Sequence, residues 1–232
     1  EMCIRDRNKI RSLNSDENVI TVEAGVILSN LRDAAEEAQR TFPLSLASEG
    51  TAQIGGNLAT NAGGVNVLRY GSTRNLCLGL EVVFADGSIW NSLSRLHKDN
   101  TGYDLKNLII GSEGTLGIIT AATMKLFPKP LEHTVALIAV KSPKEALKLL
   151  SETKDYFGET ISAFELINKM GIDFFKETKV EVKIPFSKIP EWMVLLDIGH
   201  PGRNSSEKNA NDYFENILSR LERIEKKIDS IK

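Results

Sequence analysis

The glycine-rich run from Ser48 to Gly64, SEGTAQIGGNLATNAGG, constrains this chain more than any other feature. It contains five glycines, two threonines and two asparagines, but no lysine or arginine. Glycine adopts backbone conformations that other residues avoid, and it lets the main chain approach another group closely. Successive main-chain N–H groups in such a run can form a concave nest that binds an anion without any cation. A set of tight turns has the same composition, so the run alone leaves both interpretations open.

The run matches neither common phosphate-binding fingerprint, because it contains no G-x-G-x-x-G and no G-K-[ST]. Thr51, Thr60 and Asn61 could add hydroxyl and amide donors to a nest. A second glycine-rich segment, GSEGTLGIIT, runs from Gly111 to Thr120. Gly117 would let a flat ligand approach the start of a strand, although a β-bulge and turn explain this segment equally well.

Between the two glycine-rich runs lies KDNTGYDLKNL, residues 98–108. Asn100, Thr101 and Asp104 are residue types that cap helices, and Tyr103 could pack beneath a short helix here. We favour this local capping role over a functional one.

Charge and hydropathy exclude several classes of protein. The 232 residues include 29 basic and 31 acidic ones, a net charge of −2, and no basic stripe that would favour nucleic acid. No apolar run reaches the length of a membrane span, and the first residues lack the apolar core of a secretory signal. Two cysteines, Cys3 and Cys77, make no disulfide framework. We expect both to be reduced and Cys77 to be a core residue.

Local patterns predict secondary structure in the first half of the chain. Residues 19–26 have the composition of a strand, and residues 29–40 that of a helix capped by Ser29. That helix would present one apolar face, formed by Leu31, Ala34, Ala35 and Ala38. The apolar run Leu80–Phe84 precedes Asp86-Gly87, which predicts a β-hairpin.

The order of strand and helix patterns changes after the PKP triplet at residues 128–130, which is a plausible domain boundary. Residues 134–141 have the pattern of a strand. A helix should follow, with Ser142 as its cap, Pro143 in its first position and Gly158 at its end. Strand and helix patterns then alternate, which is typical of an α+β domain.

The C-terminal segment has a heptad pattern of apolar residues: Ile217, Leu221, Ile224, Ile228 and Ile231. It spans only about two heptads, whereas a coiled coil needs about three or four. We therefore favour a helix packed on its own domain over a dimer zipper, and a homodimer remains an alternative.

The glycine-rich runs and their order resemble the FAD-linked oxidoreductases of the vanillyl-alcohol oxidase type. The resemblance rests on two segments, PLSLASEGTAQIGGNLATNAGGVNVLRYGSTRNLCLGLEVVFADGSIW and KDNTGYDLKNLIIGSEGTLGIITAATMKLFPKP. Within this family, the DNTGYDLK segment favours the branch that oxidises D-2-hydroxy acids, of the D-2-hydroxyglutarate, D-lactate or glycolate class. The resemblance covers residues 8–130 well and 131–215 loosely.

The resemblance implies an α+β fold in two domains. Residues 1–130 would form a partial FAD-binding domain of the p-cresol methylhydroxylase type, and residues 131–232 the first half of an α+β substrate domain. In the family a further glycine-rich loop precedes the strand at 19–26 and wraps the pyrophosphate, and we expect this chain to lack it. Residues 1–7 fit the family poorly, so we expect an incomplete reading frame with foreign sequence at its start.

The resemblance also implies which residues bind the FAD. Ala47–Gln53 would lie along the cofactor, Gly55 and Gly56 would pass close to it, Thr60–Gly64 would hold its pyrophosphate and ribityl region, and Glu113–Ile119 would contact its adenine and isoalloxazine ends. The implied residues are Ala47, Ser48, Glu49, Gly50, Thr51, Ala52, Gln53, Gly55, Gly56, Thr60, Asn61, Ala62, Gly63, Gly64, Glu113, Gly114, Thr115, Leu116, Gly117, Ile118 and Ile119.

The implied reaction is oxidation of a D-2-hydroxy acid by hydride transfer to the flavin. Electrons would leave to a quinone or an electron-transfer flavoprotein, in the cytoplasm or the mitochondrial matrix. In the family, the basic substrate clamp and the metal-binding histidines come after the last residue of this sequence, so we expect no metal ligand in it and assign no catalytic base. We expect His97, His133 and His200 to be surface or packing residues, and Arg69 and Arg74 are candidate substrate or phosphate contacts. The alternative is a non-catalytic flavin-holding module or an inactive fragment, and we expect the chain alone to retain little flavin and to turn over no substrate.

Overall fold

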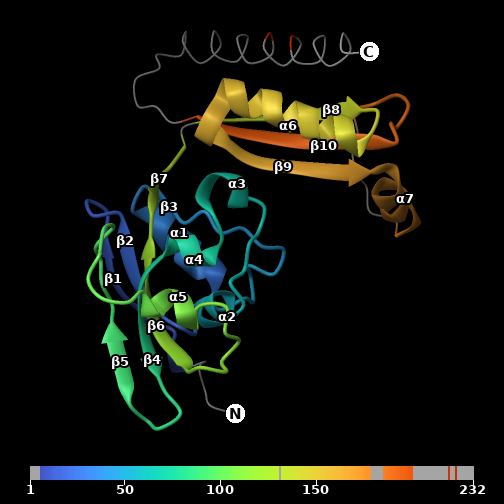
Figure 1. Ribbon diagram of the computed structural model, residues 1–232. Coiled ribbons are helices and arrows are strands. Elements are labelled where there is room, and N and C mark those ends of the chain that lie inside the picture. Colours follow the sequence, from blue (N-terminus) through green and yellow to red (C-terminus); the bar gives the residue numbers. More distant parts are fainter. Residues whose placement is uncertain (1–5, 131, 179–184, 201–218, 220–222, 224–232) are drawn as a thin grey trace. The chain divides into compact units, whose positions relative to one another are not determined.

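The computed structural model describes residues 6–130, 132–178 and 185–200, together with Ser219 and Arg223. The chain divides into two compact units, with the division between Lys129 and Pro130. Figure 1 shows the helices and strands of each unit. Residues 1–5 lie outside the described residues. So does the C-terminal segment predicted to form a helix, except for Ser219 and Arg223.

The first unit is built on a five-stranded antiparallel sheet with the strand order β1-β2-β6-β4-β5. Its strands are β1 (Ile10–Asn14), β2 (Val19–Glu23), β4 (Cys77–Val83), β5 (Ile89–Ser92) and β6 (Ile118–Lys125). The predicted hairpin joins β4 to β5, with Gly87 at a φ of 83° in its turn. The Asp86-Gly87 prediction is confirmed, because that backbone conformation favours glycine strongly.

One face of this sheet carries the core of the first unit. Ile20, Val22, Leu80, Val82 and Met124 have no exposed surface, because short helices cover them (Figure 1). The covering elements include α1 (Leu28–Glu37), α2 (Ile54–Ala59), α4 (Thr73–Leu76) and α5 (Leu105–Ile109). Each fully buried side chain of this size contributes about 1.5 to 3 kcal/mol to folding.

Helix α1 starts earlier than the sequence suggests, and Ser29 does not cap it. The residue before the first turn is Ile27, whose side chain makes no capping bond. The first amides are satisfied instead by main-chain carbonyls, since Leu28 N donates to Ala52 O at 2.8 Å and Ser29 N to Glu49 O at 3.0 Å. The prediction of a Ser29 cap was wrong because the acceptors come from a distant loop. The predicted apolar face of the helix is confirmed, because Leu31 and Ala35 are buried.

The remaining elements of the first unit are short: β3 (Arg40–Thr41), α3 (Val67–Tyr70) and β7 (Phe127–Pro128). The short helix α5 begins as predicted, because Asp104 is its N-cap and its side chain accepts a bond from Asn107 N. The prediction that Tyr103 packs beneath this helix was wrong, because its side chain is 94% exposed.

The second unit is a three-stranded antiparallel sheet with the order β8-β10-β9. Its elements are β8 (Glu132–Val140), α6 (Pro143–Phe157), the 3-10 helix η2 (Gly158–Thr160), β9 (Ile161–Asn168), α7 (Lys169–Glu177) and β10 (Trp192–His200). Helix α6 lies along one face and packs on Val194, Leu196 and Ile198 (Figure 1).

The predicted boundaries of α6 are confirmed. Ser142 accepts a bond from Glu145 N, Pro143 occupies the first turn, and Gly158 ends the helix at a φ of 53°. Helices and antiparallel sheets therefore occur in both units, which confirms the α+β class. Among the helices of the described residues, none is long and apolar enough to span a bilayer.

Candidate functional site

The first glycine-rich run contains helix α2 and the loop that follows it, and that loop requires unusual backbone angles. Asn61 has a φ of 49° and Gly64 a φ of 82°. A Cβ added to Gly64 would lie 2.3 Å from Ser45 O, so no other residue fits without a shift of the main chain. Asparagine is among the few residues that tolerate the left-handed region, which explains its place at position 61.

The second glycine-rich run docks directly against the first. Gly111 N donates to Leu58 O and Glu113 N donates to Ala59 O, both at 3.0 Å. The second loop also uses left-handed backbone, with φ values of 84° at Gly111 and 52° at Glu113. The structure therefore brings together Thr60–Gly64 and the start of Glu113–Ile119, two segments that the sequence analysis assigned to one ligand.

Both glycine-rich loops contain main-chain amides that have no hydrogen-bond acceptor among the residues that the structure describes. The amides of Gly63, Gly64 and Gly114 donate to no acceptor within the described residues. A Cβ at Gly56 or Gly114 would meet open space. Such uncommitted N–H groups in a glycine-rich turn form an anion-binding concavity.

A buried amide in α2 adds a further unused donor. Asn57 is 5% exposed, and its Nδ2 has no partner within the described part of the chain. A buried donor without a partner costs about 1 to 3 kcal/mol, so such atoms are rare unless a ligand or water satisfies them. Sequence reasoning did not select Asn57, although it lies inside the glycine-rich run. Together with the free amides, it fits a cofactor that offers several acceptors, as an FAD does.

The threonine hydroxyls of the two loops face their own main chain. Thr60 Oγ1 donates to Gly56 O at 3.0 Å, and Thr115 Oγ1 to Ser112 O at 2.7 Å. Thr51 Oγ1 makes a longer bond of the same kind to Ser48 O, at 3.3 Å. Each hydroxyl therefore tightens a turn, and its oxygen keeps only acceptor capacity.

The segment Ala47–Gln53 is held against the start of α1. Two main-chain hydrogen bonds, from Leu28 and Ser29, already join it to α1. In addition, Arg32 on α1 forms an ion pair with Glu49, and Gln53 forms an isolated antiparallel β-bridge with Ile27. None of the hydrogen bonds among the described residues joins this segment to Gly111–Ile119. Ala47–Gln53 thus borders α1, and α2 connects it to the paired loops.

Two of the selected glycines are required by protein packing. A Cβ at Gly55 would lie 2.7 Å from Ala24 Cβ, and Gly55 N donates to Ala24 O at 2.7 Å. A Cβ at Gly117 would lie 2.7 Å from Val82 Cγ1. Gly55 brings α2 close to the sheet, whereas Gly56 faces outward from the same helix.

Asn61 links the first loop to the helix α4. Its Oδ1 accepts bonds from Ser72 Oγ at 2.9 Å and from Arg74 N at 3.0 Å. The fully buried Thr73 donates twice to Ala62 O, through its amide and its hydroxyl. Residue 61 is therefore a positioning residue that fixes the loop to α4.

Arg74 links α4 to the second loop. Its guanidinium donates to the carbonyl oxygens of Asn107 and Ile110 at the end of α5. Because both acceptors are neutral, these bonds fix the side chain without cancelling its charge. One arginine thereby holds the segment before Gly111 against the helix that Asn61 positions.

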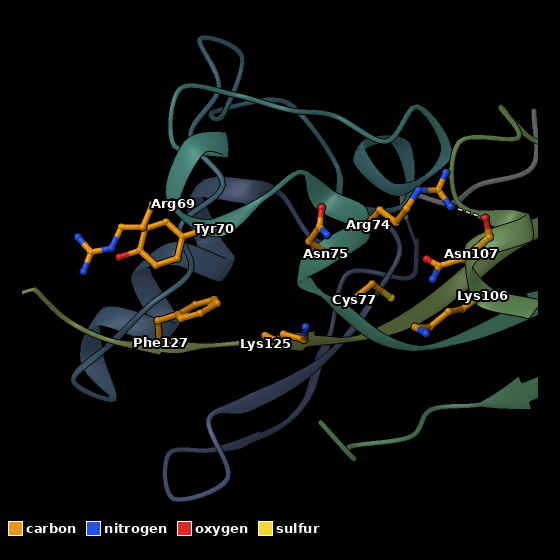
Figure 2. Close-up of a pocket in the computed structure, with 9 residues that line it drawn as sticks. All are labelled: Arg69, Tyr70, Arg74, Asn75, Cys77, Lys106, Asn107, Lys125 and Phe127. Carbon is orange, nitrogen blue, oxygen red and sulfur yellow. Dashed lines mark hydrogen bonds between the residues drawn. The ribbon is translucent and has the colours of Figure 1, made fainter. Parts of the chain in front are cut away.

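A cavity of about 340 Å³ opens beside Arg74. The residues that line it are Arg69, Tyr70, Arg74, Asn75, Cys77, Lys106, Asn107, Lys125 and Phe127 (Figure 2). Sequence reasoning selected Arg69 and Arg74 but missed Lys106 and Lys125. These lysines come from α5 and β6 and meet only in the tertiary structure, so no local pattern pointed to them.

Cys77 is one of the residues that line this cavity, and its burial confirms it as a core residue. Burial raises the pKa of its thiol to about 12, and the nearby Lys106 and Lys125 only partly oppose that shift. The thiol is therefore neutral at physiological pH and is no nucleophile.

The described histidines form no metal site. His97 contacts Glu17 O at 3.1 Å, and His133 contacts Asp197 at 2.9 Å. Within the described ranges there is no group of three or more histidine, cysteine or acidic residues that could hold a metal ion. Both contacts agree with the expected packing or surface roles of these two histidines.

An ion-pair network supports the strand that leads away from the second loop. Arg11 on β1 donates to both carboxylate oxygens of Glu81 on β4, at 3.0 and 3.1 Å. Thr120 on β6 donates to Glu81 at 2.7 Å, and Arg11 also contacts Glu23 on β2. Hydrogen bonding from Arg11 is the main cause that lowers the pKa of Glu81.

The paired loops offer main-chain donors of the kind that hold the phosphates of nucleotide cofactors. The FAD binding domain family matches residues 4–92, which agrees with the resemblance to FAD-linked oxidoreductases seen in the sequence. Its relatives include the mitochondrial D-2-hydroxyglutarate dehydrogenases of Danio rerio, 38% identical over 212 residues, and Bos taurus, 40% identical over 213 residues. A putative mitochondrial D-lactate dehydrogenase of Schizosaccharomyces pombe is 37% identical over 218 residues.

These alignments cover most of this chain but only part of each relative. They include 91% of this chain and 39% and 38% of the two D-2-hydroxyglutarate dehydrogenases, and 92% of this chain and 40% of the yeast protein. A solved structure of alkyldihydroxyacetonephosphate synthase matches 95% of this chain and 41% of its own, with a TM-score of 0.71 at 18% identity. At that identity the structural match supports the fold alone.

Proposed function

We propose that this chain is the flavin-binding part of an FAD-dependent D-2-hydroxy-acid dehydrogenase. The observation that carries the proposal is the docking of the second glycine-rich loop on the first, through Gly111–Leu58 and Glu113–Ala59. It brings the two segments with uncommitted amides close together in the fold. FAD supplies the hydride-accepting chemistry when bound, and the protein binds and orients it.

In this proposal Thr60–Gly64 holds the pyrophosphate and ribityl region through main-chain amides, and Glu113–Ile119 lies beside the ring systems. Asn57 Nδ2 is a further donor toward the cofactor. The absence of lysine and arginine from the first run fits this role, because a nest of amides holds a diphosphate without a cation.

The substrate class comes from the relatives. D-2-hydroxyglutarate and D-lactate dehydrogenases align along nearly the whole chain, so a small D-2-hydroxy acid is the proposed substrate. Their names also favour a mitochondrial compartment. A quinone or an electron-transfer flavoprotein is the proposed electron acceptor.

The test of flavin binding uses a matched pair of glycines. Gly114 and Gly87 both have positive φ, 80° and 83°, and a Cβ at either would meet no protein atom within 4 Å. Ala at each position should cost a similar, modest amount of stability, about 1 kcal/mol. Only Gly114→Ala should weaken FAD binding, by about tenfold, because its Cβ enters the space beside an uncommitted amide.

Binding is measured by titrating the chain with FAD and following quenching of flavin fluorescence, since weak binding does not survive desalting. Dye reduction by D-2-hydroxyglutarate or D-lactate, with the L-enantiomers as controls, tests the reaction in the full-length protein that contains this segment. Equal weakening by Gly114→Ala and Gly87→Ala, or no saturable FAD binding by the unmodified chain, would overturn the assignment of these loops.

A further inference from the structure

Glu113, in the second glycine-rich loop, has a backbone conformation that its residue type disfavours. Its φ is 52°, in the left-handed region, where a residue with a Cβ costs free energy and a glycine does not. The two nearest positions with the same kind of backbone, Gly111 and Gly114, are both glycines. A glutamate at position 113 therefore destabilises the loop relative to glycine, unless its side chain makes a contact that offsets the cost.

The other left-handed positions of the described chain that are not glycine have a local explanation. Asn18 and Asn61 belong to a residue type that tolerates this region, and the Oδ1 of each accepts a hydrogen bond from another residue. Gln39 directly follows the C-cap of α1, where left-handed backbone commonly ends a helix. Neither explanation applies to Glu113, because Gly111 takes the corresponding position after α5.

The described part of the protein offers the Glu113 carboxylate no partner. The side chain is exposed, and it makes no hydrogen bond or ion pair with any residue that the structure describes. Neither glycine-rich run contains a lysine or an arginine. The guanidinium of Arg74 lies near Gly111, but it donates to two main-chain carbonyls of the α5 segment. No contact among the described residues therefore offsets the cost of the backbone conformation.

The surroundings of Glu113 indicate the chemistry of a partner from outside. Its amide donates to Ala59 O at 3.0 Å, which fixes its main chain beside the first loop. The next amide, that of Gly114, is one of the uncommitted donors of the two loops. An ionised carboxylate only accepts hydrogen bonds and is repelled by a phosphate, so beside a bound diphosphate it needs a neutral donor. A sugar hydroxyl is such a donor, and carboxylates bind sugar hydroxyls in other dinucleotide sites.

We infer that the Glu113 carboxylate binds a sugar hydroxyl of the cofactor, on the ribityl chain or on the ribose, and that this bond offsets the cost of its left-handed backbone. The inference rests on the proposed function, because it requires FAD in these loops. It adds a basis for specificity. Main-chain amides bind any diphosphate, whereas the carboxylate distinguishes a diphosphate that carries a sugar from one that does not.

The test is titration of the chain with FAD, FMN, ADP and inorganic pyrophosphate, by fluorescence for the flavins and by calorimetry for the other two. Glu113→Gln should weaken FAD binding by about threefold to tenfold, because glutamine keeps an acceptor but loses the charge. Pyrophosphate should bind as before or more tightly, since it has no sugar hydroxyl and a repelling charge is removed. A weaker FMN complex assigns the contact to the ribityl chain, and a weaker ADP complex assigns it to the ribose.

Glu113→Gly and Gln39→Gly form a matched pair, because both replace an exposed side chain on left-handed backbone, with φ values of 52° and 56°. Both should raise the urea midpoint of the first unit, since glycine removes the strain. Trp90 fluorescence in a Trp192→Phe background follows that unit. Only Glu113→Gly should also weaken FAD binding, by about tenfold or more. A side chain with a purely structural role would lower the midpoint when it is removed.

The outcomes separate this inference from the proposed function. If the unmodified chain binds no FAD, the assignment of the loops fails and the inference fails with it. If Gly114→Ala weakens FAD binding but Glu113→Gln does not, the inference alone is overturned. Equal weakening of FAD and pyrophosphate by Glu113→Gln, or tighter binding of FAD, also overturns it, because the carboxylate would then act on the phosphates. A lower urea midpoint in Glu113→Gly overturns it too, since the side chain would have a partner within the protein.

Discussion

At the scale of single residues, Gly64 shows why the first loop cannot accept another side chain. Its backbone is left-handed and an added Cβ would lie 2.3 Å from Ser45 O. Gly87 has the same backbone conformation but open space around it. Alanine substitutions at the two positions therefore separate the energetic cost of backbone strain from that of a steric clash.

We expect Gly64→Ala to lower the free energy of unfolding of the first unit by about 2 to 4 kcal/mol, because strain and overpacking add. Gly87→Ala should cost about 1 kcal/mol, since only the strain applies. Urea unfolding of both variants in a Trp192→Phe background checks this, because Trp90 then reports the first unit alone. Equal losses in the two variants would contradict the contact with Ser45.

At the scale of elements, the network of Arg11, Glu81 and Glu23 joins three strands of the sheet, and Thr120 adds a fourth. Hydrogen bonds to the carboxylates lower the pKa of both glutamates below the ordinary value of 4.5. A carboxylate with a lowered pKa in the folded state stabilises the fold above its ordinary pKa. That contribution is lost as the pH falls through the folded pKa.

We therefore expect the stability of the first unit to fall as the pH drops below about 4.5, and Glu81→Gln to flatten that dependence. At neutral pH the same substitution should cost about 1.5 to 3 kcal/mol, because Arg11 loses a charged partner. Urea unfolding between pH 3 and 7 measures both effects. Glu37→Gln is the control, since Glu37 is exposed on α1 and has no ion pair with a described residue. An unchanged acid dependence in Glu81→Gln would disprove the linkage.

Sequence patterns predicted the elements whose signals are local. The Asp86-Gly87 turn and the Ser142-Pro143 start of α6 depend on neighbouring residues, and both were correct. The Ser29 cap failed because the carbonyls of Glu49 and Ala52 satisfy the first amides of α1. A bond between residues far apart in the sequence leaves no local pattern.

The candidate site shows the same division. The glycine-rich runs were visible because glycine marks backbone that only it can adopt, as at Gly64 and Gly111. Lys106 and Lys125 could not be identified from the sequence, because a lysine on the surface and a lysine that lines a cavity have the same sequence signature. Asn57 was also missed, since the absence of a partner for its amide is a property of the folded state.

At the scale of the whole molecule, the chain has two units with separate cores. Leu80 is fully buried in the first, and Leu196 is fully buried in the second. The core clusters that contain them share no residue. Each unit should therefore respond by itself to a loss of packing.

We expect Leu80→Ala to destabilise the first unit by about 2 to 5 kcal/mol and to leave the second unit nearly unchanged. Leu196→Ala should do the reverse. Trp90 lies on β5 and Trp192 on β10, so the fluorescence of single-tryptophan variants follows each unit separately. If either substitution moved both transitions equally, the two units would unfold as one.

The bonds made by Asn61 and Arg74 have a consequence for how a cofactor would be taken up. Asn61 Oδ1 and the Arg74 guanidinium are engaged by groups of the protein itself, and these bonds hold the segments of the two loops together. Little conformational freedom would then remain to be lost on association, so uptake should be governed by encounter instead of rearrangement. The surface that receives the cofactor would therefore be preorganised.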